Sequence, residues 1–273
     1  MPLRVLMDAG VVIQSEFAEP AVKETSASPV RWSDGSAIRI SGLKRKQPDE
    51  DEDYQKQKEA LFTIGRMIRE QTIEAYTYSE INVEHLRGKP LVQEFNALQG
   101  CALHKCEPAI ERSRFRRTSD FMDFFAKGGK KDRDLGLDGQ ANQIAFFEWL
   151  CALDKGCVDM IIEHASLIGL NQFEVESLRN LDWFQLVCKR SGSSENYPDV
   201  FHLWTAERRG LDALLTLDRK LPRLVDRVKN EKKREIDIRT EVLQPLDLLH
   251  RLGISEPDPV PITSGRFYNL YER

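Results

Sequence analysis

The chain has 273 residues, 41% of them hydrophobic, which is enough apolar material for one large domain or two small ones with a substantial core. Its formal net charge of -4 argues against a generally basic nucleic-acid-binding protein, although a local basic surface is compatible with that charge. No apolar stretch approaches the roughly 20 residues that a membrane-spanning helix needs, and the first residues are too short and too acidic for a secretory signal.

The first predicted element is a buried strand that ends in an acid. Leu3, Val5, Leu6 and Met7 form a short apolar run, and Asp8 follows it directly. Residues 15–29, rich in Ser, Glu, Ala and Pro, predict a loop, and residues 30–40 predict a β-hairpin with an Asp-Gly turn. The charged residues 42–53 predict a mobile segment. We therefore expect residues 15–54 to be an insertion.

A second strand with its flanking helices follows. Residues 54–73 have the apolar spacing of a long amphipathic helix, and residues 76–78 predict a strand. The helix that comes next carries two acids one turn apart, Glu80 and Glu84. A further helix is expected between Pro90 and about Gln99.

The most basic stretch lies within residues 101–140, which we expect to form an insertion of helix and loop. Basic side chains bind phosphates by displacing counterions. The candidates for substrate contact are Arg112, Arg114, Arg116, Arg117, Lys130 and Lys131, with Arg31, Arg39, Lys44 and Arg45 as a second group. The interleaved phenylalanines, Phe115 among them, have the spacing of a buried helix face, so we expect them to pack in the core.

The last third of the chain predicts three helices over residues 139–190 and then a helix, a turn and a strand with a carboxylate at each end. Asp199 opens the helix, directly after a proline that suits a helix entry. Gly210 ends the helix, and the apolar residues 213–215 form a short strand that leads to Asp218.

Three separated acids are expected to converge. In a parallel α/β sheet the strands end, and the helices begin, at the same edge, so Asp8, Asp199 and Asp218 should face one crevice. Crowded carboxylates repel one another, and a divalent cation stabilises them near neutral pH. Oxygen ligands favour Mg²⁺ or Mn²⁺. Thr216 could hydrogen-bond a carboxylate or a phosphate there. Each acid taken alone is better explained by local structure, Asp199 as a helix cap, Asp218 as a turn residue and Asp8 as an incidental acid after a strand, so the expectation depends on their combination.

These pieces resemble the PIN domain family of metal-dependent nucleases, which have a parallel sheet whose carboxyl edge carries three or four acids. The matching segments are the strand before Asp8, the helix entry at Asp199, the Thr-Leu-Asp of residues 216–218, and a closing strand and helix over residues 236–249. The family's middle acid begins a helix after the second strand. Glu84 fits that position, and Glu80 is its rival.

The resemblance implies one PIN-like domain over residues 1–273, with a central parallel sheet flanked by helices, a β-hairpin insertion and a helical insertion. It implies a nuclease, most often an endoribonuclease, in which Asp8, Glu84, Asp199 and Asp218 bind Mg²⁺ or Mn²⁺. Two alternatives stay open: an inactive PIN-like module for RNA binding or protein assembly, and a structure-specific DNA nuclease. RNA is the favoured partner over DNA, and the resemblance leaves room for a regulatory protein or a homo-oligomer.

The five cysteines, at positions 101, 106, 151, 157 and 188, are odd in number and scattered. This pattern argues against a disulfide framework and for a reducing compartment. We therefore expect a cytoplasmic protein with no membrane partner.

Overall fold

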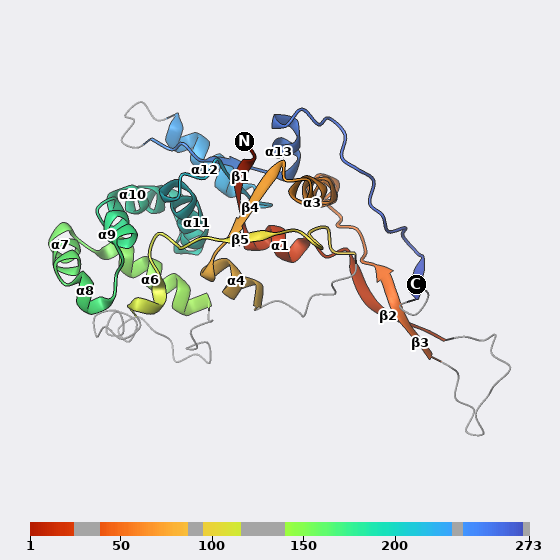
Figure 1. The fold of residues 1–273 in the computed structure, drawn as a ribbon, viewed down its shortest axis with the longest axis horizontal. Helices are drawn as coiled ribbons and strands as arrows, with labels where there is room; N and C mark the ends of the chain where they lie inside the picture. The colour runs from red at the N-terminus through yellow and green to blue at the C-terminus, as the bar shows by residue number, and fades with distance from the viewer. Residues whose placement is uncertain (25–38, 87–94, 116–139, 231–236, 270–273) are drawn as a thin grey trace, which may run out of the picture.

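The structure is a computed structural model that describes residues 1–24, 39–86, 95–115, 140–230 and 237–269. Its centre is a parallel sheet of five strands in the order β5-β4-β1-β6-β7 (Figure 1). The strands are β1 (Leu3–Met7), β4 (Ile73–Thr77), β5 (Leu103–Lys105), β6 (Ala213–Leu215) and β7 (Glu241–Leu243). The predicted α/β class with a central parallel sheet is therefore confirmed.

Strand β1 lies in the middle because its residues are apolar on both faces. It pairs with β4 on one side and β6 on the other, with Leu6 opposite Tyr76 and Leu214. Leu6 and Leu214 face one hydrophobic core, whereas Val5 and Met7 face the other. This continuous apolar run is typical of a parallel strand that helices cover on both sides.

Helices cover both faces of the sheet. The Leu6 face packs against α4 (Ser79–Leu86), α6 (Gln140–Ala152), α10 (Leu181–Ser191), α11 (Tyr197–Arg208) and α12 (Lys220–Lys229). The Val5 face packs against α1 (Ala9–Gln14), α2 (Glu52–Glu59), α3 (Leu61–Arg69) and α13 (Pro245–Arg251). None of the helices in the described ranges is long and apolar enough to cross a membrane.

Residues 139–190 contain more helices than the three that we predicted. Besides α6 and α10 they form α7 (Lys155–Glu163), α8 (Ala165–Ile168) and α9 (Gln172–Leu178), which lie beyond α6 at the far side from the sheet (Figure 1). Capping residues separate these helices. The side chains of Asp154 and Asn171 accept backbone N–H groups at the starts of α7 and α9, and Gly169, with a φ of +79°, ends α8.

A second sheet corrects the predictions for residues 15–54. Strand β2 (Ala18–Glu24), where we expected a loop, pairs antiparallel with β3 (Arg39–Arg45), and β3 pairs with β8 (Phe267–Asn269). Residues 42–45, expected to be mobile, are therefore held in the middle strand of this sheet, where Leu43 is buried. The predicted hairpin at 30–40 lies mostly outside the described residues.

The long helix predicted for residues 54–73 is two helices. It is divided at Ala60 into α2 and α3, and α3 ends before Gln71, whose positive φ of 59° stops the helix. Ile73 instead opens β4, because it is buried and pairs with Leu3. Residues 95–100, the end of another predicted helix, form turns, and strand β5 follows them where helix or loop was expected.

Candidate metal centre

Asp8 and Asp218 follow two neighbouring strands, β1 and β6, at the carboxyl edge of the sheet. The chain continues from β1 to β4 and β5 on one side, and β6 and β7 lie on the other side. The strand order therefore reverses between β1 and β6. Ligands of open α/β sheets bind outside the carboxyl ends of the strands at this kind of reversal.

Helix α11 brings two more ligand groups to the same place. Asp199 lies in its first turn and His202 three residues later, a spacing that places both side chains on one face of the helix. Asp8, Asp199 and His202 each offer one ligand atom, and these atoms lie within 4.8 Å of one another. They are the one such group of three among the described His, Cys, Asp and Glu residues.

Burial and crowding change the protonation of these groups. Burial raises the pKa of Asp8 above its ordinary value, although His202 and the Thr216 hydroxyl oppose the rise. Burial and the neighbouring Asp8 raise the pKa of Asp199 to about 7. Burial alone would lower the pKa of His202, but the attraction of Glu84, Asp8 and Asp199 outweighs it and raises that pKa to about 9.

The His202 ring is held between a phenol and two carboxylates. Its Nδ1 lies 2.5 Å from the Tyr78 hydroxyl, and burial keeps the pKa of that phenol well above its ordinary value. Its Nε2 lies 3.5 Å from Oε1 of Glu84 and 3.8 Å from Oδ1 of Asp8. Within the described part of the chain, Nε2 is buried and has these ion-pair contacts but no hydrogen bond.

Thr216 joins the acids of the two strands. Its hydroxyl donates to Oδ2 of Asp8 at 2.9 Å and accepts the backbone N–H of Asp218 at 3.0 Å. The Asp218 carboxylate accepts the backbone N–H of Lys220 at 2.9 Å. Asp218 also contributes to the raised pKa of Asp199, so the two carboxylates are electrostatic neighbours. The contact of Thr216 is thus with a carboxylate.

The two rival acids of α4 have different surroundings. Glu80 is buried and forms an ion pair with Arg112 at 2.9 Å. Glu84 lies beside His202, and the Gln143 side-chain amide donates to Glu84 at 2.6 Å and to Glu80 at 3.3 Å. The structure therefore brings Glu84, and not Glu80, next to Asp8 and His202.

The predicted substrate residues are not gathered at this centre. Arg112, expected to contact substrate, has a side chain only 5% exposed because it pairs with Glu80 inside the molecule. Lys44 and Arg45 form ion pairs with Glu19 and Glu59. Arg31, Arg116, Arg117, Lys130 and Lys131 lie outside the described residues, as does the environment of the Arg39 side chain. Phe115 is buried in the core, as predicted.

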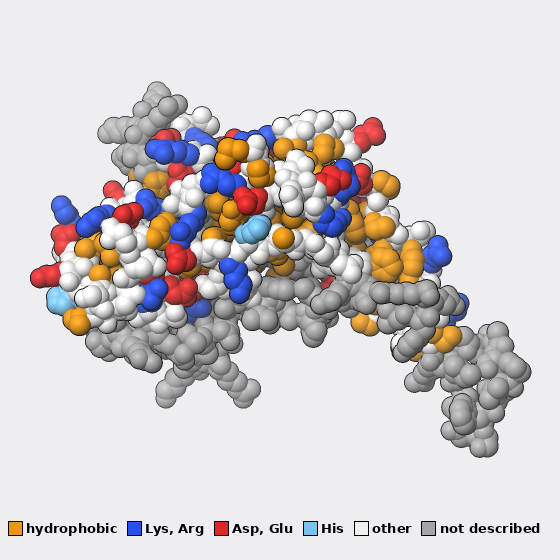
Figure 2. All heavy atoms as spheres, viewed as in Figure 1, with side chains coloured by type: hydrophobic (Ala, Val, Ile, Leu, Met, Phe, Trp, Pro, Cys, Tyr) orange, Lys and Arg blue, Asp and Glu red, His pale blue; other side chains and the backbone are white. Residues whose placement is uncertain are grey.

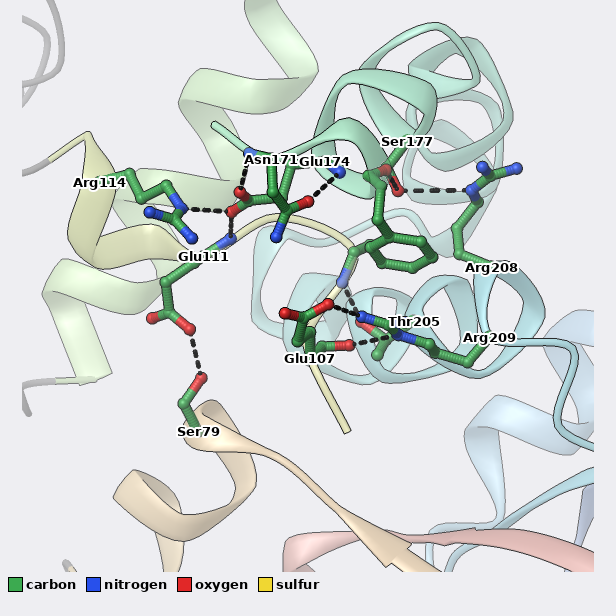
Figure 3. A network of polar contacts seen from close by, with 12 residues as sticks. Ser79, Glu107, Glu111, Arg114, Asn171, Glu174, Ser177, Thr205, Arg208 and Arg209 are labelled. Atoms are coloured by element: carbon green, nitrogen blue, oxygen red, sulfur yellow. Dashed lines mark hydrogen bonds and ion pairs between the residues drawn. The ribbon is translucent and has the colours of Figure 1, made fainter. Parts of the chain in front are cut away.

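Arg114 belongs to a structural network rather than to the metal centre (Figure 3). It forms an ion pair at 2.7 Å with the buried Glu174, which also accepts the backbone N–H of Glu111 and of Asn171. Nearby, Arg209 forms an ion pair with Glu107, and the Thr205 hydroxyl accepts the Ala109 backbone N–H. These contacts fasten the segment after β5 to α9 and α11.

The sequence reasoning missed His202. The signal was present, since His202 follows Asp199 at a spacing of three residues in a predicted helix, so both had to share a face. A search confined to acids passed over it.

Comparison with known proteins adds no relative: no protein-family model, no curated protein and no solved structure matches this chain.

Proposed function

We propose that this protein is a metal-dependent nuclease of the PIN-like type, and that its substrate is RNA. The observation that carries the proposal is the convergence of Asp8, Asp199 and His202 at the strand-order reversal. Glu84 and Asp218 lie beside them. A parallel sheet with acids along its carboxyl edge is what the resemblance implies, and this arrangement supports it.

The residues fit a divalent cation. Three carboxylates (Asp8, Glu84 and Asp199) gather around one imidazole, and Asp218 lies beside Asp199. Burial of negative charge without compensation is costly. A cation among them would offset that charge and would displace the proton of His202, which leaves the buried Nε2 able to bind the ion. An imidazole among carboxylates favours Mn²⁺ over Mg²⁺, because Mg²⁺ prefers oxygen ligands throughout.

A bound divalent ion would neutralise phosphate charge, lower the pKa of water and stabilise a departing oxygen. The chain's own groups supply the rest. Asp199 lies at a cleft, where its carboxylate would bind the ion or orient the attacking water. Tyr78 orients the His202 ring, and Thr216 fixes one oxygen of Asp8.

One observation favours the inactive RNA-binding or assembly module as a second candidate. With a pKa of about 9, His202 is an imidazolium at neutral pH and supplies positive charge inside the cluster without any metal. The nuclease requires a bound metal ion for cleavage, whereas the binding or assembly module requires none. In either case the five cysteines, which form no disulfide, fit the reducing cytoplasm that we propose as the location.

The test is cleavage of end-labelled single-stranded RNA, structured RNA and DNA with Mn²⁺, Mg²⁺ or a chelator. We expect metal-dependent cleavage of RNA that Asp8→Asn reduces by at least about 100-fold, the scale on which removal of a preorganised electrostatic group acts. The matched control is Asp212→Asn, because Asp212 lies at the opposite end of β6 and pairs with Arg4.

The cluster would be excluded from the reaction if Asp8→Asn still cleaved RNA, or if Asp212→Asn lost as much cleavage as Asp8→Asn. The inactive module would replace the nuclease if no substrate were cut and Mn²⁺ left the melting temperature unchanged.

A further inference from the structure

A cleft of about 170 Å³ opens beside the metal centre. Asp199 and Asp218 form its acidic side, and α12 and the segment before α11 form the remainder. The other lining residues are Ser191, Asn196, Lys220, Leu221, Leu224 and Arg227. The cleft therefore places two cations and a small apolar floor next to two acids of the proposed active site.

The two cations of the cleft are available to a ligand. Lys220 and Arg227 are exposed, and within the described residues neither forms an ion pair, even with Asp199 or Asp218 in the same cleft. Asp218 accepts the backbone N–H of Lys220 instead of its ammonium group. If Lys220 and Arg227 served only to neutralise Asp199 and Asp218, they would form ion pairs with them. Because they do not, the cleft is suited to an anion from outside the protein.

Helix α12 presents these cations on a rigid support. Leu221 and Leu224 are buried and anchor the helix in the core on the Leu6 face of the sheet. At its start, Arg219 forms ion pairs with Asp51 and Asp53 of the α2 region. The helix has four basic residues, Lys220, Arg223, Arg227 and Lys229, against one acid.

We infer that this cleft binds the sugar-phosphate backbone of a single-stranded polynucleotide, through Lys220 and Arg227, at a phosphate next to the one at the metal centre. The inference rests on the proposed function and deepens it. A cleft of about 170 Å³ suits a single backbone segment rather than a duplex. Leu221 and Leu224 give the sugar an apolar contact.

The negative net charge of the protein favours such a local site. On the face shown in Figure 2, basic and acidic side chains are interspersed and no continuous basic surface is visible. With a net charge of -4 and four clustered carboxylates, the protein would repel a polyanion unless cations stood near the acids. Lys220 and Arg227 are cations that line the same cleft as Asp199 and Asp218.

The test compares two double variants of one helix. Lys220→Ala with Arg227→Ala removes the cations of the cleft, whereas Arg223→Ala with Lys229→Ala removes the same charge from exposed positions outside its lining. Binding of a fluorescent single-stranded RNA is measured by anisotropy in chelator over a range of salt concentrations, and melting temperatures verify folding.

We expect the cleft variant alone to bind more weakly, with a slope of log K against log salt that is shallower by about 0.7 for each lost phosphate contact. Three results would overturn the inference: equal salt slopes in wild type and the cleft variant, equal losses of RNA affinity in both double variants, or tighter binding of duplex than of single-stranded RNA.

The outcomes also separate this inference from the proposed activity. If the wild type cleaves RNA and the cleft variant binds RNA normally, the cleft is not the binding site, but the proposed nuclease activity stands. If the wild type never cleaves RNA but the cleft variant shows a shallower salt dependence of binding, the cleft is the binding site of an inactive RNA-binding protein.

Discussion

Helix α4 carries two acids, one turn apart, that meet different partners. Glu80 lies 2.9 Å from the Arg112 guanidinium, and both side chains are about 95% buried. Glu84 shares a single imidazole with Asp8 and Asp199. Within the described residues, the first acid is matched by one full opposite charge, whereas the second lies beside one imidazole that two further carboxylates share. The Glu80 side chain is also the more buried, 4% exposed against 19% for Glu84. A matched charge and deeper burial therefore distinguish the structural acid Glu80 from Glu84.

Gln143 of α6 connects the two regions, because its amide donates to both carboxylates. The structural pair can therefore orient Glu84 through this amide. A change at Arg112 should be felt at the metal centre as well as in the core.

The largest effect is expected from Arg112→Met, which leaves Glu80 buried without its partner. Loss of one member of a buried ion pair costs about 3 to 5 kcal/mol of unfolding free energy. Urea unfolding measures it, and the double variant Arg112→Met with Glu80→Leu should recover most of the loss, because no charge is then left buried. A loss below about 1 kcal/mol would show that Glu80 does not need the guanidinium.

A smaller effect is expected from Arg114→Ala, although it also breaks an ion pair to a buried glutamate. The Arg114 side chain is 33% exposed, and Glu174 keeps two backbone N–H donors from Glu111 and Asn171. We expect a loss of about 1 to 2 kcal/mol in the same unfolding experiment. A loss as large as that of Arg112→Met would mean that backbone donors do not compensate a carboxylate here.

An effect of opposite sign is expected from Asp199→Asn in metal-free protein. A carboxyl whose pKa rises from 3.8 to about 7 on folding binds its proton more tightly in the native state, so its contribution to stability is lost as pH rises between these values. The neutral amide avoids that loss, which is about 1.4 kcal/mol per pKa unit, and should stabilise the protein by up to about 4 kcal/mol at pH 7.

The pH dependence of unfolding sharpens this prediction. His202, whose pKa rises from 6.5 to about 9, stabilises the native state fully below 6.5 and less as pH rises through 9. Wild type without metal should therefore lose stability from about pH 4 to pH 9, and Asp199→Asn should lose less of it below about pH 7, where Asp8, whose pKa burial also raises, still titrates. Parallel curves for the two proteins would show that Asp199 does not titrate as proposed.

The sequence predicted the sheet and the approach of three acids because these depend on local patterns. The apolar run before Asp8, the helix entry at Asp199 and the strand before Asp218 each have a signal within a few residues. The parallel geometry then places their ends together.

Other features depend on contacts that no local pattern contains. Arg112 looked like a surface cation because its partner, Glu80, lies 32 positions away. Strand β2 looked like a loop because its order comes from pairing with β3. The choice between Glu80 and Glu84 likewise needed the position of α11, since His202 distinguishes the two.

The central place of β1 also has a consequence for protein synthesis. Leu6 is made 208 positions before its partner Leu214. Until residues beyond 213 have emerged, one edge of β1 stays open and Asp8 has neither Thr216 nor Asp199 beside it. A nascent chain therefore cannot assemble the cluster, and the proposed activity would arise only after translation has passed β6.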